Sequence, residues 1–181
     1  MRVAYKGLVL AALHLALVCS LGAKLLYDRA YRPRVWIKVA PRDPDLPIRG
    51  RYISLSMEVP TEGFTIRSQP SYYMKDKDGK PEMEDFISPT HCDLMLRHGQ
   101  LTAVAREDGD FWIVLRGAHG KSVPMVNSQT AYFIPEHMND PSRISRDEEL
   151  WMEATIPRKG PPRPIRLGVK KNGVLTPLPV S

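Results

Sequence analysis

The sequence predicts a mostly β protein, in which an N-terminal transmembrane helix precedes a single β-sandwich or partly open β-barrel-like domain with at most one short helix. Two observations lead to this prediction. An uncharged, apolar run occupies residues 7–23 of the 181-residue chain. The remainder contains many short segments in which apolar and polar residues alternate, separated by turn-forming residues. We therefore divide the chain into a membrane anchor at 1–30 and a β-rich domain at 35–181.

The apolar run is bracketed by Lys6 and Lys24. Its 17 residues reach about 25 Å as a helix, and extension to Tyr27 covers a hydrocarbon core of about 30 Å. Residues 7–27 therefore predict one uncleaved membrane span in contact with the lipid bilayer. A cleaved signal peptide is the main alternative, because Val18 and Ser20 fit the small or medium residues of a cleavage site. A buried soluble helix is the third.

The positive charge of the chain lies at its two ends. The net charge is +6, yet residues 35–153 hold 14 bases and 19 acids, whereas residues 154–181 hold six bases and no acid. A nucleic-acid-binding domain concentrates basic residues on its folded body, so this class is excluded. The C-terminal bases, from Arg158 to Lys171, fit either solvated strand faces or a surface that docks to lipid or to an acidic partner. Basic residues flank both ends of the span, and the positive-inside rule does not orient it.

Alternating residues predict the strands of the body. Residues 35–39 and 52–59 follow this pattern, and further strands are expected at 64–67, 101–106, 111–116, 130–134, 150–156 and 165–169. Asp108–Asp110 is expected to turn a hairpin between the strands on either side of it, and Asn172-Gly173 to turn another. One short helix is expected at Asp140–Leu150, where Pro141 falls in the first turn.

Ser56 is the only residue for which we consider a catalytic role. Its segment, Ser54–Met57, resembles the Ser-Met nucleophile segment of bacterial type I signal peptidases, which pair that serine with a downstream lysine base. The candidate downstream segment at 103–110 carries Arg106 and no lysine. Arginine stays protonated at neutral pH and cannot serve as the base. A membrane-tethered serine peptidase using Ser56 remains the alternative function, and no catalytic residue is predicted.

No cofactor or metal is predicted either. Residues 74–85 align with a calcium loop at five positions, but they begin with Met74 and end with Asp85, and a solvated Asp-Gly turn is the favoured interpretation. The histidines and Cys92 lack the spacing of metal ligands. Aromatic residues of the strands, including Trp112 and Trp151, are assigned to the core and its rim. Cys19 lies in the span, which leaves Cys92 without an intrachain disulfide partner in the body.

Gly50, Tyr52 and Leu55 follow one another with the spacing Gly-X-Tyr-X-X-Leu. In this respect the chain resembles the bacterial GDYXXLXY domain family, although Arg51 and Met57 stand where the signature has Asp and Tyr. The segments 132–136 and 160–165 are also similar to this family. The positions expected to have a structural or partner-binding role are Asp43, Pro44, Arg49, Gly50, Tyr52, Leu55 and Glu136. We further expect Asp43 and Arg49 to pair across the turn that precedes the strand.

The resemblance implies an architecture rather than a reaction. Family members look like single-pass proteins with an N-terminal span and a β-rich domain outside the cytoplasm, often encoded beside or fused to multi-spanning membrane proteins. No activity is established for them. The resemblance thus implies a cell-membrane protein with a periplasmic C-terminal domain that binds or assembles with a multi-spanning membrane protein. A cytoplasmic adaptor tethered by its N-terminus is the interpretation for the opposite orientation.

Overall fold

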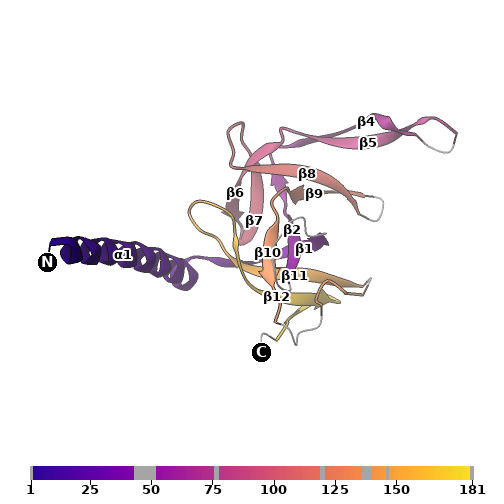
Figure 1. Cartoon of the computed structure of the whole chain (residues 1–181). Helices are drawn as coiled ribbons and strands as arrows, with labels where there is room; N and C mark the ends of the chain where they lie inside the picture. The colour runs from indigo at the N-terminus through magenta and orange to yellow at the C-terminus, as the bar shows by residue number, and fades with distance from the viewer. Residues whose placement is uncertain are drawn as a thin grey trace.

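The computed structural model describes residues 2–42, 52–75, 78–118, 121–135, 140–145 and 147–179. Within these residues the chain forms one helix, α1 (Arg2–Tyr31), followed by a body of β-strands (Figure 1). The strands are β1 (Arg34–Arg42), β2 (Tyr52–Glu58), β3 (Thr61–Glu62), β4 (Thr65–Lys75), β5 (Pro81–Ser88), β6 (His91–Arg97), β7 (Gln100–Ala105), β8 (Phe111–Ala118), β9 (Lys121–Val126), β10 (Thr130–Phe133), β11 (Glu148–Thr155), β12 (Arg163–Lys171) and β13 (Val174–Pro177). The predicted fold class is confirmed, because the chain is mostly β with one N-terminal apolar helix.

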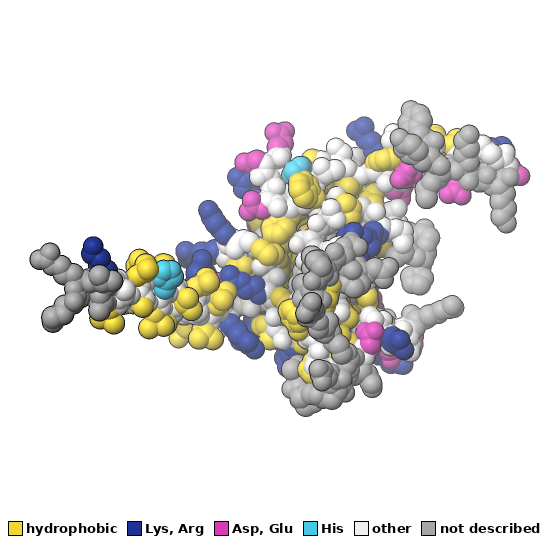
Figure 2. Space-filling view, viewed as in Figure 1, with side chains coloured by type: hydrophobic (Ala, Val, Ile, Leu, Met, Phe, Trp, Pro, Cys, Tyr) yellow, Lys and Arg dark blue, Asp and Glu magenta, His cyan; other side chains and the backbone are white. Residues whose placement is uncertain are grey.

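Helix α1 projects from the body with its apolar side chains uncovered (Figures 1 and 2). The segment Lys6–Tyr31 is long and apolar enough to cross a membrane, and none of its most apolar window is buried in the protein. A helix of 30 residues is about 45 Å long, which exceeds a hydrocarbon core of about 30 Å. The helix can therefore cross the core and still extend into a headgroup layer.

The body is one long sheet that folds back on itself. Eleven strands belong to it: the order β13-β12-β11-β1-β2-β9-β8-β6-β7-β3 gives ten of them, and β10 pairs with β2. Cα atoms of β7 lie within 8 Å of those of β1, so the far end of the sheet returns over its first half. The result is a sheet-rich domain without a closed barrel. Strands β4 and β5 pair only with each other and form an arm that extends away from the body (Figure 1).

Apolar residues at alternating positions of β1 and β11 form part of the core. Val35, Ile37 and Val39 are buried on one face of β1, as the sequence pattern predicts. Opposite them in the same cluster lie Leu55, Met57, Leu101, Ala103, Ile113, Leu150, Met152 and Leu167. Complete burial of each large apolar side chain contributes about 1.5–3 kcal/mol, so this cluster is the main stabilising feature of the body.

Two local predictions are wrong. The expected helix at Asp140–Leu150 is absent: residues 141–142 form a turn and β11 begins at Glu148. The carboxylate of Asp140 accepts hydrogen bonds from the Ser142 amide (2.9 Å) and hydroxyl (2.7 Å), a local arrangement that competes with helix formation. Leu150 instead alternates into the core with its β11 neighbours.

The expected hairpin at Asp108–Asp110 is the second wrong prediction. Strands β7 and β8 flank this turn in sequence, but β6 lies between them in the sheet and pairs with both. The hairpin predicted at Asn172-Gly173 is confirmed, because β12 pairs directly with β13 and both turn residues have positive φ angles (51° and 81°).

A carboxylate joins α1 to the body. Asp28, in the last turn of α1, is only 6% exposed, and its two oxygens accept hydrogen bonds from Arg32 Nε (3.2 Å), just after the helix, and Arg163 Nη1 (2.9 Å) on β12. Only residues 32 and 33 separate α1 from β1, and the Pro33 carbonyl accepts a hydrogen bond from the Ile156 amide at the end of β11 (3.0 Å). The end of the helix is therefore fixed against the β11–β12 edge. We refer to the Asp28–Arg32–Arg163 group as the joint.

Replacement of Asp28 by Asn is expected to loosen this joint, because two guanidinium groups lose their shared counter-charge. Tryptic cleavage after Arg29 in the full chain in detergent micelles should become several-fold faster. Asp108→Asn removes an exposed carboxylate elsewhere on the body and is the control, with an expected rate equal to that of the wild type. An unchanged rate in Asp28→Asn would contradict the proposed role of the joint.

Candidate functional site

The main candidate site is a cleft of about 430 Å³ at the meeting of β1, β2, β3, β7, β9 and β11. Trp36 and Trp151 line it from neighbouring strands, and Gln100, Leu101 and Pro124 line the opposite side. Its size falls in the range of clefts that hold small molecules or peptide side chains. We call it the tryptophan cleft.

A charged network lies on the tryptophan side of the cleft. Lys38 stands between Trp151 of β11 and Glu58 of β2 in the strand register. Its Nζ atom forms ion pairs with Glu58 (3.3 Å) and Glu149 (3.0 Å). The indole Nε1 of Trp151 donates to Glu149 (3.1 Å), so one carboxylate holds both the lysine and the ring in place.

Two basic side chains of β12 also lie over the rings of Trp36 and Trp151. Lys170 Nζ lies 4.7 Å from the centre of the Trp151 ring, and the Arg166 guanidinium lies 5.6 Å from that of Trp36. Arg166 is itself bound to Glu153 (2.6 Å). These contacts fix the orientation of both rings before any ligand arrives, which lowers the entropy cost of binding.

The titration behaviour of the cleft favours binding over proton transfer. Burial lowers the pKa of Lys38, but its hydrogen bonds to Glu149 and Glu58 outweigh this effect, so the pKa is raised. Burial alone would raise the pKa of Glu149. Hydrogen bonds from Lys38 and Trp151 stabilise the charged carboxylate more strongly, so the pKa of Glu149 is lowered. Both groups are charged at neutral pH, and a general base needs a pKa near the working pH. The network therefore acts as a fixed set of charges.

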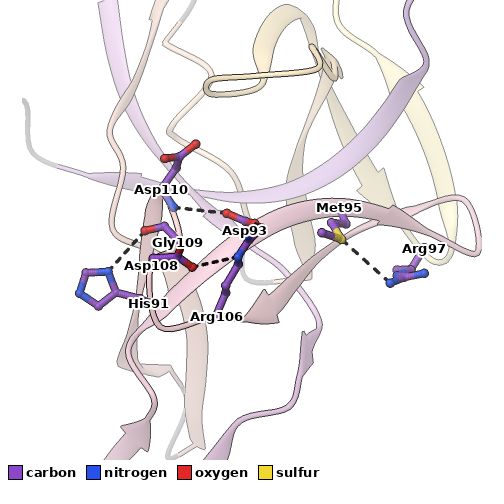
Figure 3. Close-up of polar contacts among 8 residues, drawn as sticks. All are labelled: His91, Asp93, Met95, Arg97, Arg106, Asp108, Gly109 and Asp110. Carbon is purple, nitrogen blue, oxygen red and sulfur yellow. Dashed lines mark hydrogen bonds and ion pairs between the residues drawn. The ribbon is translucent and has the colours of Figure 1, made fainter.

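A second charged group lies on β6 and the turn before β8 (Figure 3). Arg106 binds Asp93 (2.7 Å) and Asp108 (2.9 Å), and the Asp110 amide donates to Asp93 (3.3 Å). The hydrogen bond from Arg106 is the main reason that the pKa of Asp93 is lowered. These residues form one wall of a cavity of about 400 Å³ whose other wall includes Arg158 and Lys159.

Gly109 explains how this turn crosses β6. A Cβ atom at position 109 would lie 2.3 Å from the carbonyl carbon of Cys92 and 2.7 Å from its nitrogen, so only glycine fits. Cys92 is fully buried beneath the turn, and this burial is the main cause that raises the pKa of its thiol to about 11. The segment between β7 and β8 thus does not turn a hairpin. It passes closely over β6, which lies between these two strands in the sheet.

Two of the signature residues lie in the described part of the chain. Leu55 is fully buried in the core, and Tyr52 is half-buried with its ring 6.3 Å from that of Phe133. Asp43, Pro44, Arg49, Gly50 and Glu136 lie outside the described residues, as does the expected pair between Asp43 and Arg49.

Ser56 occupies the middle of β2, opposite Ala40 of β1, and is 2% exposed. In the described part of the chain no hydrogen bond joins a lysine to its hydroxyl group. A nucleophile must reach its substrate and its base, and this position provides neither.

The calcium-loop alignment falls partly on a strand. Residues 76 and 77 lie outside the described residues, and Asp85 belongs to β5. The carboxylate of Asp85 accepts hydrogen bonds from the hydroxyl groups of Ser122 and Ser68, which lower its pKa. Asp78 and Gly79 form the turn at the end of the arm, where Gly79 has a φ angle of 78°.

The tryptophan cleft is not predicted by the sequence pattern. The pattern assigns Trp151 to the core or its rim and gives no role to Trp36, although both occupy the polar positions of alternating strands, together with Lys38. That alternation was the available signal for outward-facing aromatic residues. The pairing of β1 with β11, which brings the two rings to one site, has no local signal in the sequence.

Comparisons with protein-family models, curated proteins and solved structures found no match for this chain. The tryptophan cleft and the joint are therefore interpreted from their own geometry.

Gly109→Ala is expected to destabilise the body by about 1–3 kcal/mol, because the added methyl group overlaps the backbone of Cys92. Gly117→Ala is the matched control, since Gly117 lies on β8 with open space around it and is expected to change stability by less than about 1 kcal/mol. Thermal unfolding of the full chain in micelles measures both. Equal midpoints for the two variants would show that the close crossing is unimportant.

Proposed function

We propose that this chain is a single-pass, non-enzymatic membrane protein whose β domain lies in the periplasm and binds another membrane protein through the tryptophan cleft. The observation that carries the proposal is the preordered pair of half-buried tryptophans in an open cleft, with their neighbouring charges already paired. Tryptophan is among the residues that contribute most to binding energy at protein interfaces.

The anchor supports a partner in the same membrane. Helix α1 is suited to hold the body at the bilayer surface, where it meets other membrane proteins at a high effective concentration. A multi-spanning partner is the one implied by the resemblance of residues 39–57 to the GDYXXLXY domain family. Residues 35–181 hold 20 bases and 19 acids, and this nearly neutral balance disfavours nucleic acid.

The position of Ser56 supports a non-enzymatic role over the peptidase alternative. Its hydroxyl group is buried within a paired strand, and the segment expected to supply a base carries Arg106, which is bound to Asp93 and Asp108. The cleft itself contains no serine or cysteine among its lining residues.

The periplasmic location is tested by fusing alkaline phosphatase after Ser181. This enzyme is active only when exported, so a periplasmic β domain predicts an active fusion at normal expression. An inactive fusion that is expressed as well as an exported control would place the domain in the cytoplasm.

Partner binding is tested by placing a photo-cross-linking amino acid at Gln100, an exposed position at the edge of the cleft. Irradiation of native membranes followed by mass spectrometry is expected to recover one multi-spanning membrane protein. The same probe at Glu82, exposed on the arm, is the matched control and is expected not to recover it. Recovery of no membrane protein from Gln100 would contradict the proposal.

Trp151→Ala should lower the yield of this cross-linked product about ten-fold or more, because the ring is the proposed anchor for the partner. Trp112→Ala is the matched control: Trp112 is 51% exposed on β8 and lies outside the cleft. Trp151→Phe retains an aromatic ring and should restore part of the yield. An equal loss in the Trp112 and Trp151 variants would exclude the cleft as the binding site.

A further inference from the structure

Six basic residues gather on the face of the body that surrounds the end of α1. They come from the last turn of the helix and the residue just after it, from the start of β1, and from the loop and strand start after β11: Arg29, Arg32, Arg34, Arg158, Lys159 and Arg163. Figure 2 shows dark blue side chains around the point where the helix meets the body. We call this group the basic collar. Asp28 of the joint forms ion pairs with two of them, Arg32 and Arg163.

The fold brings residues from both ends of the sequence into this collar. The Ile156 amide bonds to the Pro33 carbonyl (3.0 Å), so the β11–β12 loop starts beside the end of the helix. A small pocket between Leu25 and Arg29 of α1 and Arg163 of β12 shows that helix and strand lie side by side. Figure 1 shows the β11–β12 loop on the side of the body that faces α1.

Four side chains of the collar have no intramolecular counter-charge. Arg32 and Arg163 share Asp28, whereas in the described part of the chain no acidic residue forms an ion pair with Arg29, Arg34, Arg158 or Lys159. All four are exposed, and Arg34 donates to the Arg29 carbonyl (2.8 Å). Asp108 and Asp110 line the same cavity as Arg158 and Lys159, but no ion pair crosses it.

The other C-terminal bases have partners within the body. Arg166 binds Glu153, Lys170 covers the Trp151 ring, and Lys171 binds Asp147 and Glu148 (both 3.1 Å). The basic C-terminal segment thus consists of two groups. One group stabilises the sheet, and the other, Arg158 with Lys159, lies on the loop that starts beside the end of the helix.

We propose that the basic collar binds the headgroups of anionic phospholipids and thereby holds the body on the membrane surface. If residues 7–27 span the hydrocarbon core, Arg29 follows within about one helical turn, at the level of the phosphates. Tyr27 and Tyr31 are exposed on the same turns with ring centres 4.8 Å apart, as is typical of aromatic residues at a membrane interface. A cluster of cations beside a span attracts anionic lipid. This inference is independent of the partner proposed for the tryptophan cleft.

The test uses the full chain reconstituted in vesicles of phosphatidylcholine that contain a trace of spin-labelled phosphatidylglycerol or spin-labelled phosphatidylcholine. Electron paramagnetic resonance gives the fraction of each lipid that is immobilised by the protein, and hence the preference for the anionic headgroup. The wild type is expected to prefer phosphatidylglycerol, and high salt should weaken this preference because it screens exposed charges.

The triple variant Arg29→Gln, Arg158→Gln, Lys159→Gln removes three of the four unpaired charges and leaves the joint intact. Each charge near an anionic surface contributes about 1 kcal/mol, so each neutralisation should lower the preference by about five-fold. Arg67→Gln with Arg116→Gln is the matched control, because these bases lie on β4 and β8, which extend away from α1 (Figure 1). The control should retain the wild-type preference.

Two results would overturn the inference. One is a wild-type preference in the triple variant with an unchanged circular dichroism spectrum, which would show that the collar does not bind lipid. The other is an equal loss in the triple variant and in the control, which would show a non-specific response to net charge.

Discussion

The carboxylate of Asp28 is the interaction on which the arrangement of this molecule depends. It binds Arg32, which follows the helix directly, and Arg163 of β12, and both contacts lie at the point where an apolar helix is followed by a β-sheet. With two residues between helix and first strand, little chain is left to act as a hinge. The orientation of the body relative to the span is therefore a property of the fold. Everything proposed for the surfaces of the body follows from this fixed orientation.

Two surfaces of the body differ in how their charges are used. In the tryptophan cleft the charges are paired: Glu149 binds both Lys38 and the indole of Trp151, and Arg166, which is paired with Glu153, covers the ring of Trp36. In the basic collar the charges of Arg29, Arg158 and Lys159 remain available. A prepaired network suits recognition of a protein surface, whereas free cations suit a layer of phosphates. The two proposals therefore assign lipid and protein to separate surfaces of the body.

Features encoded locally could be predicted from the sequence, and features created by long-range pairing could not. The strand at 35–39 and the hairpin at Asn172-Gly173 follow from alternation and from turn residues that accept positive φ angles. The turn at Asp108–Asp110 looked like a hairpin because nothing in its own residues shows that β6 inserts between its flanking strands. The cleft was missed for the same reason, since Trp36 and Trp151 meet only through the pairing of β1 with β11.

The central claim is that the joint fixes the helix-proximal face of the body at the headgroup layer. It is tested most directly by paramagnetic relaxation in nanodiscs that contain a gadolinium-chelating lipid. A nitroxide or fluorine label is attached at Pro161→Cys, in the β11–β12 loop, or at Glu82→Cys, on the arm, in a Cys19→Ser background. The account predicts strong relaxation at position 161 and weak relaxation at position 82. Equal relaxation at the two positions would show that the body moves freely about the end of the helix and would contradict the account.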